Sequence, residues 1–333
     1  MRRIALALLA LLVGVPLGVW LGARASLDGE RRHAAATRAL PLLSPDTDRG
    51  LVRVAANGFT FRARVAGLGG DGPGLVLLHG WPETSIMWEP LLARAAEAGF
   101  RVVAFDQRGY SPGARPTGTA AYAVAGLVDD LMAVADAAGF ERFHLVGHDW
   151  GSIVGWAAAA RRPDRVASWA SLSIAHPGAL RDPESPPSTP LYVRLFRAPG
   201  VAESFLGFGG RLAMHRVLYA GMSDAHRAEY DAVFAEPGAL TATLEWYRAL
   251  DPAAPDMTRL GPVRQRVLYV YGEHDIPVFV NAGVQERLPA FVEGPFERIA
   301  LDAGHWLIEE QEAIVVDALM EHLATARAEE EAR

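Results

Sequence analysis

The chain has 333 residues, of which 50% are hydrophobic and 21% are charged, so it is long enough for one large globular domain with an insertion or for two domains. Its formal net charge of −7 and the lack of a basic cluster in its main body argue against nucleic acid as a partner. Because it contains no cysteine, disulfides, thiolate zinc sites and cysteine nucleophiles are excluded.

The first residues are typical of an export signal. Two arginines follow the initial methionine and precede an uncharged apolar run over residues 4–23, and the small residue Ala25 suits a cleavage site. The run is also close to the ~20 residues that a bilayer-spanning helix needs. We therefore expect an exported protein, secreted or periplasmic, or a protein that residues 1–25 anchor in a membrane. Residues 26–49 are interpreted as a linker.

Strand and helix patterns alternate along the chain from there. Residues 51–65 alternate around Asn57-Gly58, which favours a β-hairpin. Short apolar runs predict further strands, and longer stretches between them predict helices. The predicted strands are residues 75–78, 101–105, 143–146, 168–174, 267–271 and 296–301, and the predicted helices are residues 87–98, 122–138, 152–160 and 309–326. This alternation is typical of a mostly parallel sheet flanked by helices, with ligands at the carboxyl ends of the strands.

The alternation stops over residues 176–256. This stretch is rich in proline at first, and then helical in pattern with many aromatic residues. We predict that it is a helical cap inserted into an α/β core made of residues 50–175 and 257–326. A separately folding helical domain is the alternative, but the stretch is short and ends without a linker.

Five polar loops follow predicted strands. The central loop is Gly147-His148-Asp149-Trp150-Gly151, whose spelling matches the strand-turn-helix elbow that exposes a nucleophile in α/β-hydrolases, with glycines where a side chain would clash. The other four loops begin at His79, Asp106, Gly272 and Ala303. One such elbow is weak evidence, whereas five loops in this order are strong evidence.

With these loops, the chain resembles the α/β-hydrolase superfamily over roughly residues 50–326, and within it the epoxide hydrolases and the related haloalkane dehalogenases, whose elbows carry aspartate. The resemblance implies the α/β-hydrolase fold, with Asp149 as nucleophile, His305 as base and Asp275 as the acid that orients the base. It also implies an oxyanion hole made by the backbone N–H groups of Trp81 and Trp150, a cis bond before Pro82, and a site without metal or organic cofactor.

A carboxylate suits this elbow when the electrophile is an sp³ carbon. Asp149 is already ionised at neutral pH, so it can attack without first losing a proton, and the product is an alkyl-enzyme ester. Water that His305 deprotonates would then attack the carboxyl carbon of Asp149. A serine would suit an acyl carbon better.

The leaving group distinguishes epoxides from haloalkanes. An opened epoxide is a basic alkoxide that needs a proton donor, and Tyr192 and Tyr247 lie in segments, LYVRLFRAPGVAE and LEWYRAL, that resemble the tyrosine-bearing cap segments of epoxide hydrolases. A phenol with a pKa near 10 can donate to the ring oxygen and stays protonated at neutral pH. We therefore expect an epoxide hydrolase that converts a small apolar epoxide and water to a vicinal diol, in a pocket lined by Trp81, Trp150 and Trp306.

Two other functions stay open. A haloalkane dehalogenase would use Trp150 as a halide donor, although Trp81 stands where those enzymes often carry asparagine, and no arginine follows Asp149 as in fluoroacetate-type dehalogenases. A non-catalytic ligand-binding protein on the same fold is the third interpretation, but such a protein would not need a water-activating base.

Several of these residues also have structural interpretations. Asp149 could be a turn aspartate, and Glu273 competes with Asp275 for the role of the acid. His79, Asp106 and His148 are expected to support the geometry of the loops rather than to perform chemistry.

Overall fold

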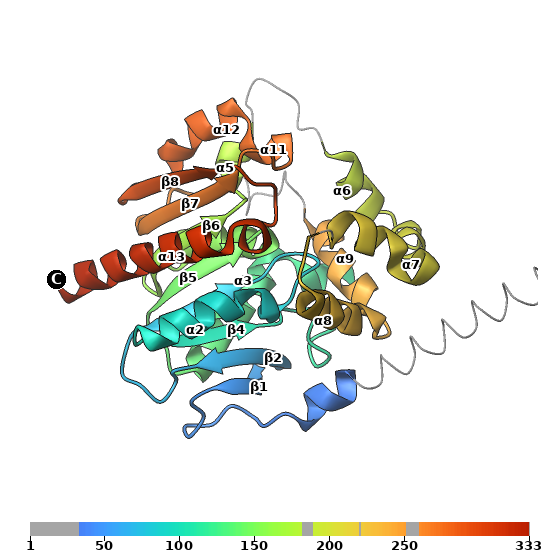
Figure 1. Ribbon diagram of the computed structural model, residues 1–333, viewed down its shortest axis with the longest axis horizontal. Helices are drawn as coiled ribbons and strands as arrows, with labels where there is room; N and C mark the ends of the chain where they lie inside the picture. The colour runs from blue at the N-terminus through green and yellow to red at the C-terminus, as the bar shows by residue number, and fades with distance from the viewer. Residues whose placement is uncertain (1–32, 182–188, 220, 251–259, 333) are drawn as a thin grey trace, which may run out of the picture.

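The computed structural model describes residues 33–181, 189–219, 221–250 and 260–332. Within these residues lies one eight-stranded sheet in the order β1-β2-β4-β3-β5-β6-β7-β8 (Figure 1). The pairings of β2 with β1 and β4 are antiparallel, and the remaining pairings are parallel. The strands are β1 (Gly50–Ala56), β2 (Phe59–Ala66), β3 (Gly74–Leu78), β4 (Arg101–Phe105), β5 (Phe143–His148), β6 (Val166–Leu172), β7 (Arg266–Gly272) and β8 (Phe296–Leu301).

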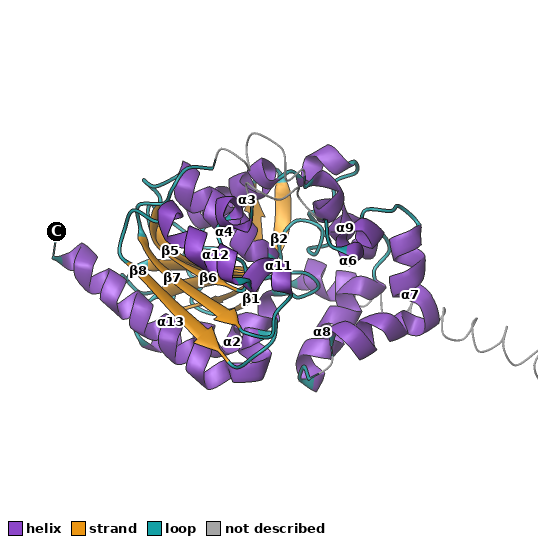
Figure 2. Ribbon diagram, turned by 90° about the horizontal axis from the view of Figure 1, so that it is seen from above, coloured by secondary structure: helices purple, strands orange, loops and turns teal. Residues whose placement is uncertain are grey.

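Helices cover both faces of this sheet (Figure 2). Side chains alternate across a strand, so Leu75 and Leu77 of β3 pack toward α2 (Glu89–Glu97) and α13 (Leu307–Glu331), while Val76 and Leu78 pack toward α3 (Val124–Ala137) and α4 (Trp150–Arg161). Each helix presents an apolar side to the sheet, which gives two buried core layers. The structure therefore confirms the predicted α/β-hydrolase fold.

Between β6 and β7 the described chain is helical. Figure 1 places α6 (Leu191–Phe196), α7 (Val201–Ala213), α8 (Asp224–Ala235) and α9 (Ala239–Ala249) together beside the sheet, and we call these four helices the helical insert. The π-helical turn η3 (Met214–Leu218) follows α7. Two short helices in the loops after β3 and β4 contact the insert, because η1 (Ser85–Trp88) touches α8 and η2 (Thr119–Tyr122) touches α9. The insert therefore lies over the carboxyl ends of the strands.

Some short helices have no counterpart in the sequence predictions. Residues 33–39, inside the expected linker, form a helix, and α11 (Pro277–Val280), α12 (Ala282–Arg287) and η4 (Leu288–Phe291) fill the connection from β7 to β8. A further short helix, α5 (Pro177–Leu180), packs against α12 and η4 on the core. Helices this short are not stable alone, so their formation depends on tertiary packing that a sequence pattern does not contain.

The expectation of export or membrane anchoring is wrong. None of the helices within the described part of the chain is both long and apolar enough to cross a membrane. Helix α13 is long enough at 25 residues, but Glu309, Glu310 and further charged residues interrupt its apolar face. The apolar run over residues 4–23, and the proposed signal or anchor over residues 1–25, lie outside the described residues.

Candidate active site

Asp149 lies at a strained turn between β5 and α4. Its φ of 49° and ψ of −115° are unusual for a residue with a side chain, and such conformations cost roughly 1–3 kcal/mol. The turn is tight because glycines flank it: a Cβ at Gly147 would lie 2.5 Å from the carbonyl oxygen of Gly151, and a Cβ at Gly151 would lie 2.2 Å from that of Leu78. The elbow thus exposes a carboxylate at the carboxyl end of the sheet, where the sequence predicts it.

The loop after β3 presents a backbone donor to this carboxylate. The Trp81 N–H donates to Oδ1 of Asp149 over 2.8 Å, and the Trp81-Pro82 bond is cis. Gly80 permits this approach, because a Cβ there would lie 2.5 Å from the Cβ of Asp149. Trp150, the second residue expected to supply an N–H group, follows Asp149 as the first residue of α4.

His305 lies between Asp149 and a second carboxylate. Its Nδ1 is 2.9 Å from both oxygens of Asp275, and its Nε2 is 3.5 Å from Oδ2 of Asp149. Asp275 follows β7 and is buried, whereas its competitor Glu273 is exposed. The structure therefore brings together Asp149, His305 and Asp275 from three loops at the same edge of the sheet.

Asp149 and His305 stabilise each other in their charged forms. Burial raises the pKa of Asp149, but the hydrogen bond and charge of His305 and the charge of His148 lower it more, so the pKa lies below the usual range of aspartate. Burial lowers the pKa of His305, but Asp149 and Asp275 raise it more, so the pKa lies well above 6.5. The resting site is an imidazolium between two carboxylates.

A buried glutamate joins three of the loops, and the sequence analysis did not single it out. Glu83 Oε2 accepts from the backbone N–H of Gly80 over 3.2 Å and from Nδ1 of His148 over 2.7 Å. Nε2 of His148 lies 2.9 Å from the carbonyl oxygen of His305. Both nitrogens of His148 therefore lie beside acceptors. Burial lowers the pKa of His148, but Glu83 raises it more. Glu83 is the one charged residue of the stretch 81–88, but its partners, which are backbone groups and a histidine, are not visible in the sequence.

His79 and Asp106, which were also expected to support the geometry of the loops, contact loop backbone. His79 Nε2 accepts from the N–H of Gln107 over 3.0 Å, and Asp106 Oδ1 accepts from the N–H of Ser85 over 2.8 Å. Both side chains are fully buried. Neither side chain hydrogen-bonds to Asp149 in the described part of the chain; Asp106 also pairs with Arg62.

Aromatic side chains of the helical insert enclose the carboxylate. The ring centroid of Tyr247 on α9 lies 5.0 Å from that of Trp150 and 5.7 Å from that of Trp81. The ring centroid of Tyr192 on α6 lies 6.4 Å from that of Tyr247. Burial and the charge of Asp149 raise the pKa of both tyrosines, so each remains a protonated donor.

Two further aromatic residues complete this enclosure. Trp306, expected in the pocket, lies with its ring centroid 4.9 Å from that of His305. Phe196, which the sequence analysis did not select, lies between the two tyrosines and Trp81, with its centroid 5.0 Å from that of Tyr247, 5.6 Å from that of Tyr192 and 4.7 Å from that of Trp81. The surroundings of Asp149 are therefore apolar apart from a few directed donors.

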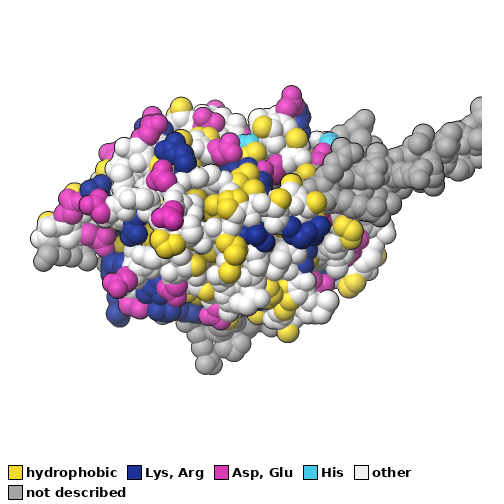
Figure 3. All heavy atoms as spheres, turned by 90° about the horizontal axis from the view of Figure 1, so that it is seen from below, with side chains coloured by type: hydrophobic (Ala, Val, Ile, Leu, Met, Phe, Trp, Pro, Cys, Tyr) yellow, Lys and Arg dark blue, Asp and Glu magenta, His cyan; other side chains and the backbone are white. Residues whose placement is uncertain are grey.

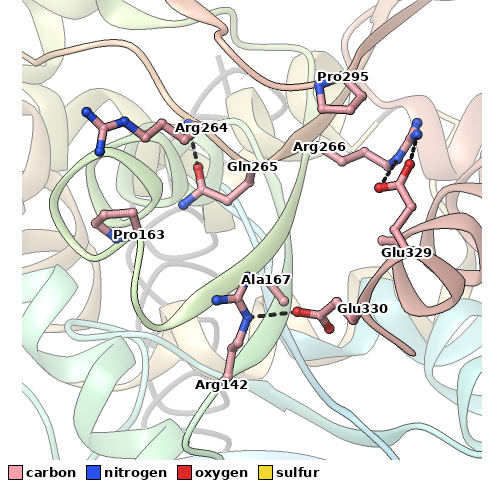
Figure 4. Close-up of a pocket in the computed structure, with 10 residues that line it drawn as sticks. Arg142, Pro163, Ala167, Arg264, Gln265, Arg266, Pro295, Glu329 and Glu330 are labelled. Carbon is pink, nitrogen blue, oxygen red and sulfur yellow. Dashed lines mark hydrogen bonds and ion pairs between the residues drawn. The ribbon is translucent and has the colours of Figure 1, made fainter. Parts of the chain in front are cut away.

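A polar pocket of about 220 Å³ lies at the opposite ends of the strands (Figure 4). Arg142 precedes β5 and pairs there with Glu330, while Arg266 begins β7 and pairs with Glu329. These arginines are neutralised by the end of α13 and lie away from Asp149. Among the residues that the structure describes, no three His, Cys, Asp or Glu side chains are grouped to hold a metal ion.

Comparisons with known proteins agree with this geometry. A family model described as the α/β hydrolase fold matches residues 73–312. Epoxide hydrolase A of Mycobacterium tuberculosis is 31% identical over 315 residues, covering 81% of this chain and 96% of that protein. The AB hydrolase superfamily protein YfhM of Bacillus subtilis is 31% identical over 290 residues, with the same two coverages.

Solved structures extend the comparison to three dimensions. The crystal structure of epoxide hydrolase A from Mycobacterium thermoresistibile matches with a TM-score of 0.68 and 28% identity, covering 83% of this chain and 98% of that one. Potato epoxide hydrolase I matches with a TM-score of 0.71 at 22% identity, which supports the fold alone. The family model covers most of the chain, and curated relatives match over nearly their full length. This chain therefore belongs to the α/β-hydrolase family, within the branch of the epoxide hydrolases.

Proposed function

We propose that this protein hydrolyses a small apolar epoxide to a vicinal diol through a covalent ester on Asp149. The observation that carries the proposal is the placement of Tyr192 and Tyr247 beside the Asp149–His305–Asp275 set. Further support comes from the epoxide hydrolase names of relatives matched over most of the chain. The helical insert acts as the cap in this proposal, because it supplies both tyrosines.

The first step is attack by Asp149 on a ring carbon. Oδ1 is held by the Trp81 N–H, so we assign the attack to Oδ2. As the new C–O bond forms, the ring C–O bond breaks, and its electron pair moves to the ring oxygen. A proton from Tyr192 or Tyr247 neutralises that oxygen, because an alkoxide is a poor leaving group without a donor. The products are an alkyl ester and a tyrosinate.

The second step is hydrolysis of the ester. The imidazolium of His305 first gives its proton to the tyrosinate. His305 Nε2 then accepts a proton from water, whose oxygen attacks the carboxyl carbon of Asp149. Negative charge then develops on Oδ1 beside the backbone N–H groups of Trp81 and Trp150, and losing one such donor generally costs about 2.7–4 kcal/mol of transition-state stabilisation. The tetrahedral intermediate expels the diol, which takes the proton from His305. The proton of the new carboxylic acid passes to His305, which restores the imidazolium and the Asp149 carboxylate.

The substrate class follows from the lining of the site. Trp81, Trp150, Phe196 and Trp306 offer aromatic surface and few hydrogen-bond donors, so an apolar epoxide can leave water there without losing polar contacts. The pair of tyrosines favours an epoxide over a haloalkane, because a halide needs no proton when it leaves.

A single turnover in heavy-oxygen water tests the ester route. With enzyme in excess over styrene oxide, the label is expected in the Asp149 carboxylate, detected by mass spectrometry of the peptide. Label in the diol alone would exclude the ester. The His305→Gln variant should accumulate alkylated protein, visible as added mass, and an unmodified inactive variant would contradict the role of His305.

Substitution of the tyrosines tests the choice of electrophile. The double change Tyr192→Phe and Tyr247→Phe should abolish formation of the diol, while Tyr271→Phe, a change on β7, serves as a matched control. A panel of 1-haloalkanes is assayed beside the epoxides. Halide release without diol formation would favour the dehalogenase, and no reaction with either class would favour a ligand-binding protein.

A further inference from the structure

Tyr192 and Tyr247 belong to two different helices that the chain does not connect directly. Tyr192 lies near the start of α6, and Tyr247 lies in the last turn of α9. To protonate the same ring oxygen, both hydroxyls must be held to within about 0.5 Å of their working positions. The separation of α6 and α9 therefore determines whether the pair can act together.

Arg197 joins the ends of these helices. It is the residue at which α6 ends, and its Nε donates to the backbone carbonyl of Tyr247 over 2.8 Å, while its Nη2 donates to the carbonyl of Leu250, where α9 ends. The last carbonyls of a helix have no partner within it and carry partial negative charge, so a guanidinium is a favourable donor there. One of the two bonds is made to the backbone of a proposed proton donor itself.

The ring of Phe196 packs in the same space. It lies one residue before Arg197 and touches both tyrosine rings, with centroid separations of 5.0 Å and 5.6 Å. Apolar packing of this kind resists compression but does not fix direction. The two hydrogen bonds from the planar guanidinium supply the direction, because they require a particular orientation of α6 against α9.

We infer that Arg197 is a positioning residue, which sets the distance between Tyr192 and Tyr247 by fastening the end of α6 to the end of α9. This inference rests on the proposed function. Arg197 makes no contact with Asp149 or His305 in the described hydrogen bonds, so its influence is confined to the step that uses the tyrosines. That step is ester formation, whereas ester hydrolysis uses His305 and the backbone donors.

Single-turnover kinetics with styrene oxide separate the two steps. Ester formation can be followed by tryptophan fluorescence, since Trp81 and Trp150 lie beside Asp149, and hydrolysis by loss of the alkylated mass. Arg197→Ala should slow ester formation at least tenfold and leave the rate of hydrolysis within twofold. Arg197→Lys should recover part of the loss, because an ammonium group can reach one carbonyl but cannot bridge both.

Matched controls make each outcome decisive. Arg194→Ala removes an exposed arginine from the same helix and should leave both rates unchanged. In a Tyr192→Phe background, Arg197→Ala should cost less than threefold, because one member of the pair is already absent. If wild-type protein and Arg194→Ala form no diol, the proposed function fails. If they do form diol, and Arg197→Ala either matches them or slows both steps equally, the positioning role is overturned. Thermal unfolding midpoints show whether Arg197→Ala has lost its fold. If it has, the two rates of Arg197→Lys decide whether Arg197 positions the tyrosines.

Discussion

The charges of Asp149 and His305 depend on each other, and this dependence bears on the order of the chemical steps. In the resting site, His305 is an imidazolium because two carboxylates surround it. A protonated imidazole cannot accept a proton from water. Esterification removes the charge of Asp149, which lowers the pKa of the His305 imidazolium, so that it can give its proton to the tyrosinate and become available as a base. The base is therefore switched on by the first step.

The Asp149→Asn variant tests this coupling directly. Like the ester, an amide at position 149 carries no charge, so the pKa of His305 should fall toward 6.5, the value of an unperturbed histidine. NMR titration of the imidazole measures the change. Asp71→Asn, at an exposed position far from His305 in the chain, should leave this titration as it is in the wild type. An equal pKa in both variants would mean that Asp275 alone determines the charge of His305.

At the scale of single residues, the sequence predicted which polar residues share one edge of the sheet, because parallel strands bring their carboxyl ends together. Asp149, His305 and Asp275 could be selected in this way, and so could the two tyrosines through their resemblance to family segments. Glu83 and Arg197 could not, because their partners are backbone groups and a histidine that come together through tertiary packing. A side chain that binds backbone leaves no complementary residue in the sequence.

Helix α8 is attached to the core by a buried network of charges. Glu229 on α8 accepts from Arg62 Nη2 over 2.8 Å and from Arg64 Nη2 over 2.6 Å, and both arginines lie on β2. Arg62 also binds Asp106 over 2.8 Å. These arginines lower the pKa of Glu229 well below its usual range against the opposing effect of burial. The network connects the helical insert to the antiparallel edge of the sheet.

Replacing Glu229 with Gln should destabilise the protein strongly. The change keeps the size of the side chain but leaves the two buried guanidinium groups with only Asp106 and the exposed Glu89 as carboxylate partners. Breaking a buried pair typically costs about 3–5 kcal/mol. The free energy of unfolding from urea denaturation measures the loss. Asp224→Asn, on the same helix but with a side chain that is 95% exposed, should cost less than about 1 kcal/mol. Similar losses in both variants would show that the network adds nothing beyond a surface pair.

Long elements were predictable and short ones were not. Each expected strand is present. Most of the parallel strands are continuous apolar runs that the sheet buries. The hairpin has positive φ angles of 49° and 75° at Asn57 and Gly58, as its turn requires. The helices between β7 and β8 and the helix at 33–39 depend on their neighbours instead. His33, for example, bonds to Glu236 at the end of α8, a contact between residues far apart in the chain.

For the whole molecule, composition predicted the class of protein but not its location. The balance of apolar and charged residues fits an α/β core with a mixed surface, and Figure 3 shows acidic and basic side chains interspersed over one face. The error about export came from a local pattern in residues 4–23. Composition alone cannot show whether a run of apolar residues beside arginines acts as an export signal. Within the described residues, no helix is both long and apolar enough to span a membrane.

Buried histidines should make the free energy of unfolding of the whole molecule depend on pH in the acidic range. Burial lowers the pKa of His144 and His176 to about 4 and that of His322 to about 3. Between pH 6.5 and these values, the unfolded chain binds protons that the folded protein does not, so stability falls as the pH falls. Each histidine contributes a slope of about 1.4 kcal/mol per pH unit in that window.

Urea denaturation at several pH values between 6 and 4.5 measures this slope, and His322→Gln isolates one contribution. Glutamine is neutral at every pH, so the variant should lose about 1.4 kcal/mol per pH unit of the dependence. His274→Gln, which changes a side chain that is 69% exposed, should preserve the slope of the wild type. An unchanged slope in His322→Gln would mean that this part of the core opens to water before the molecule unfolds, so that its histidine is protonated in the folded state.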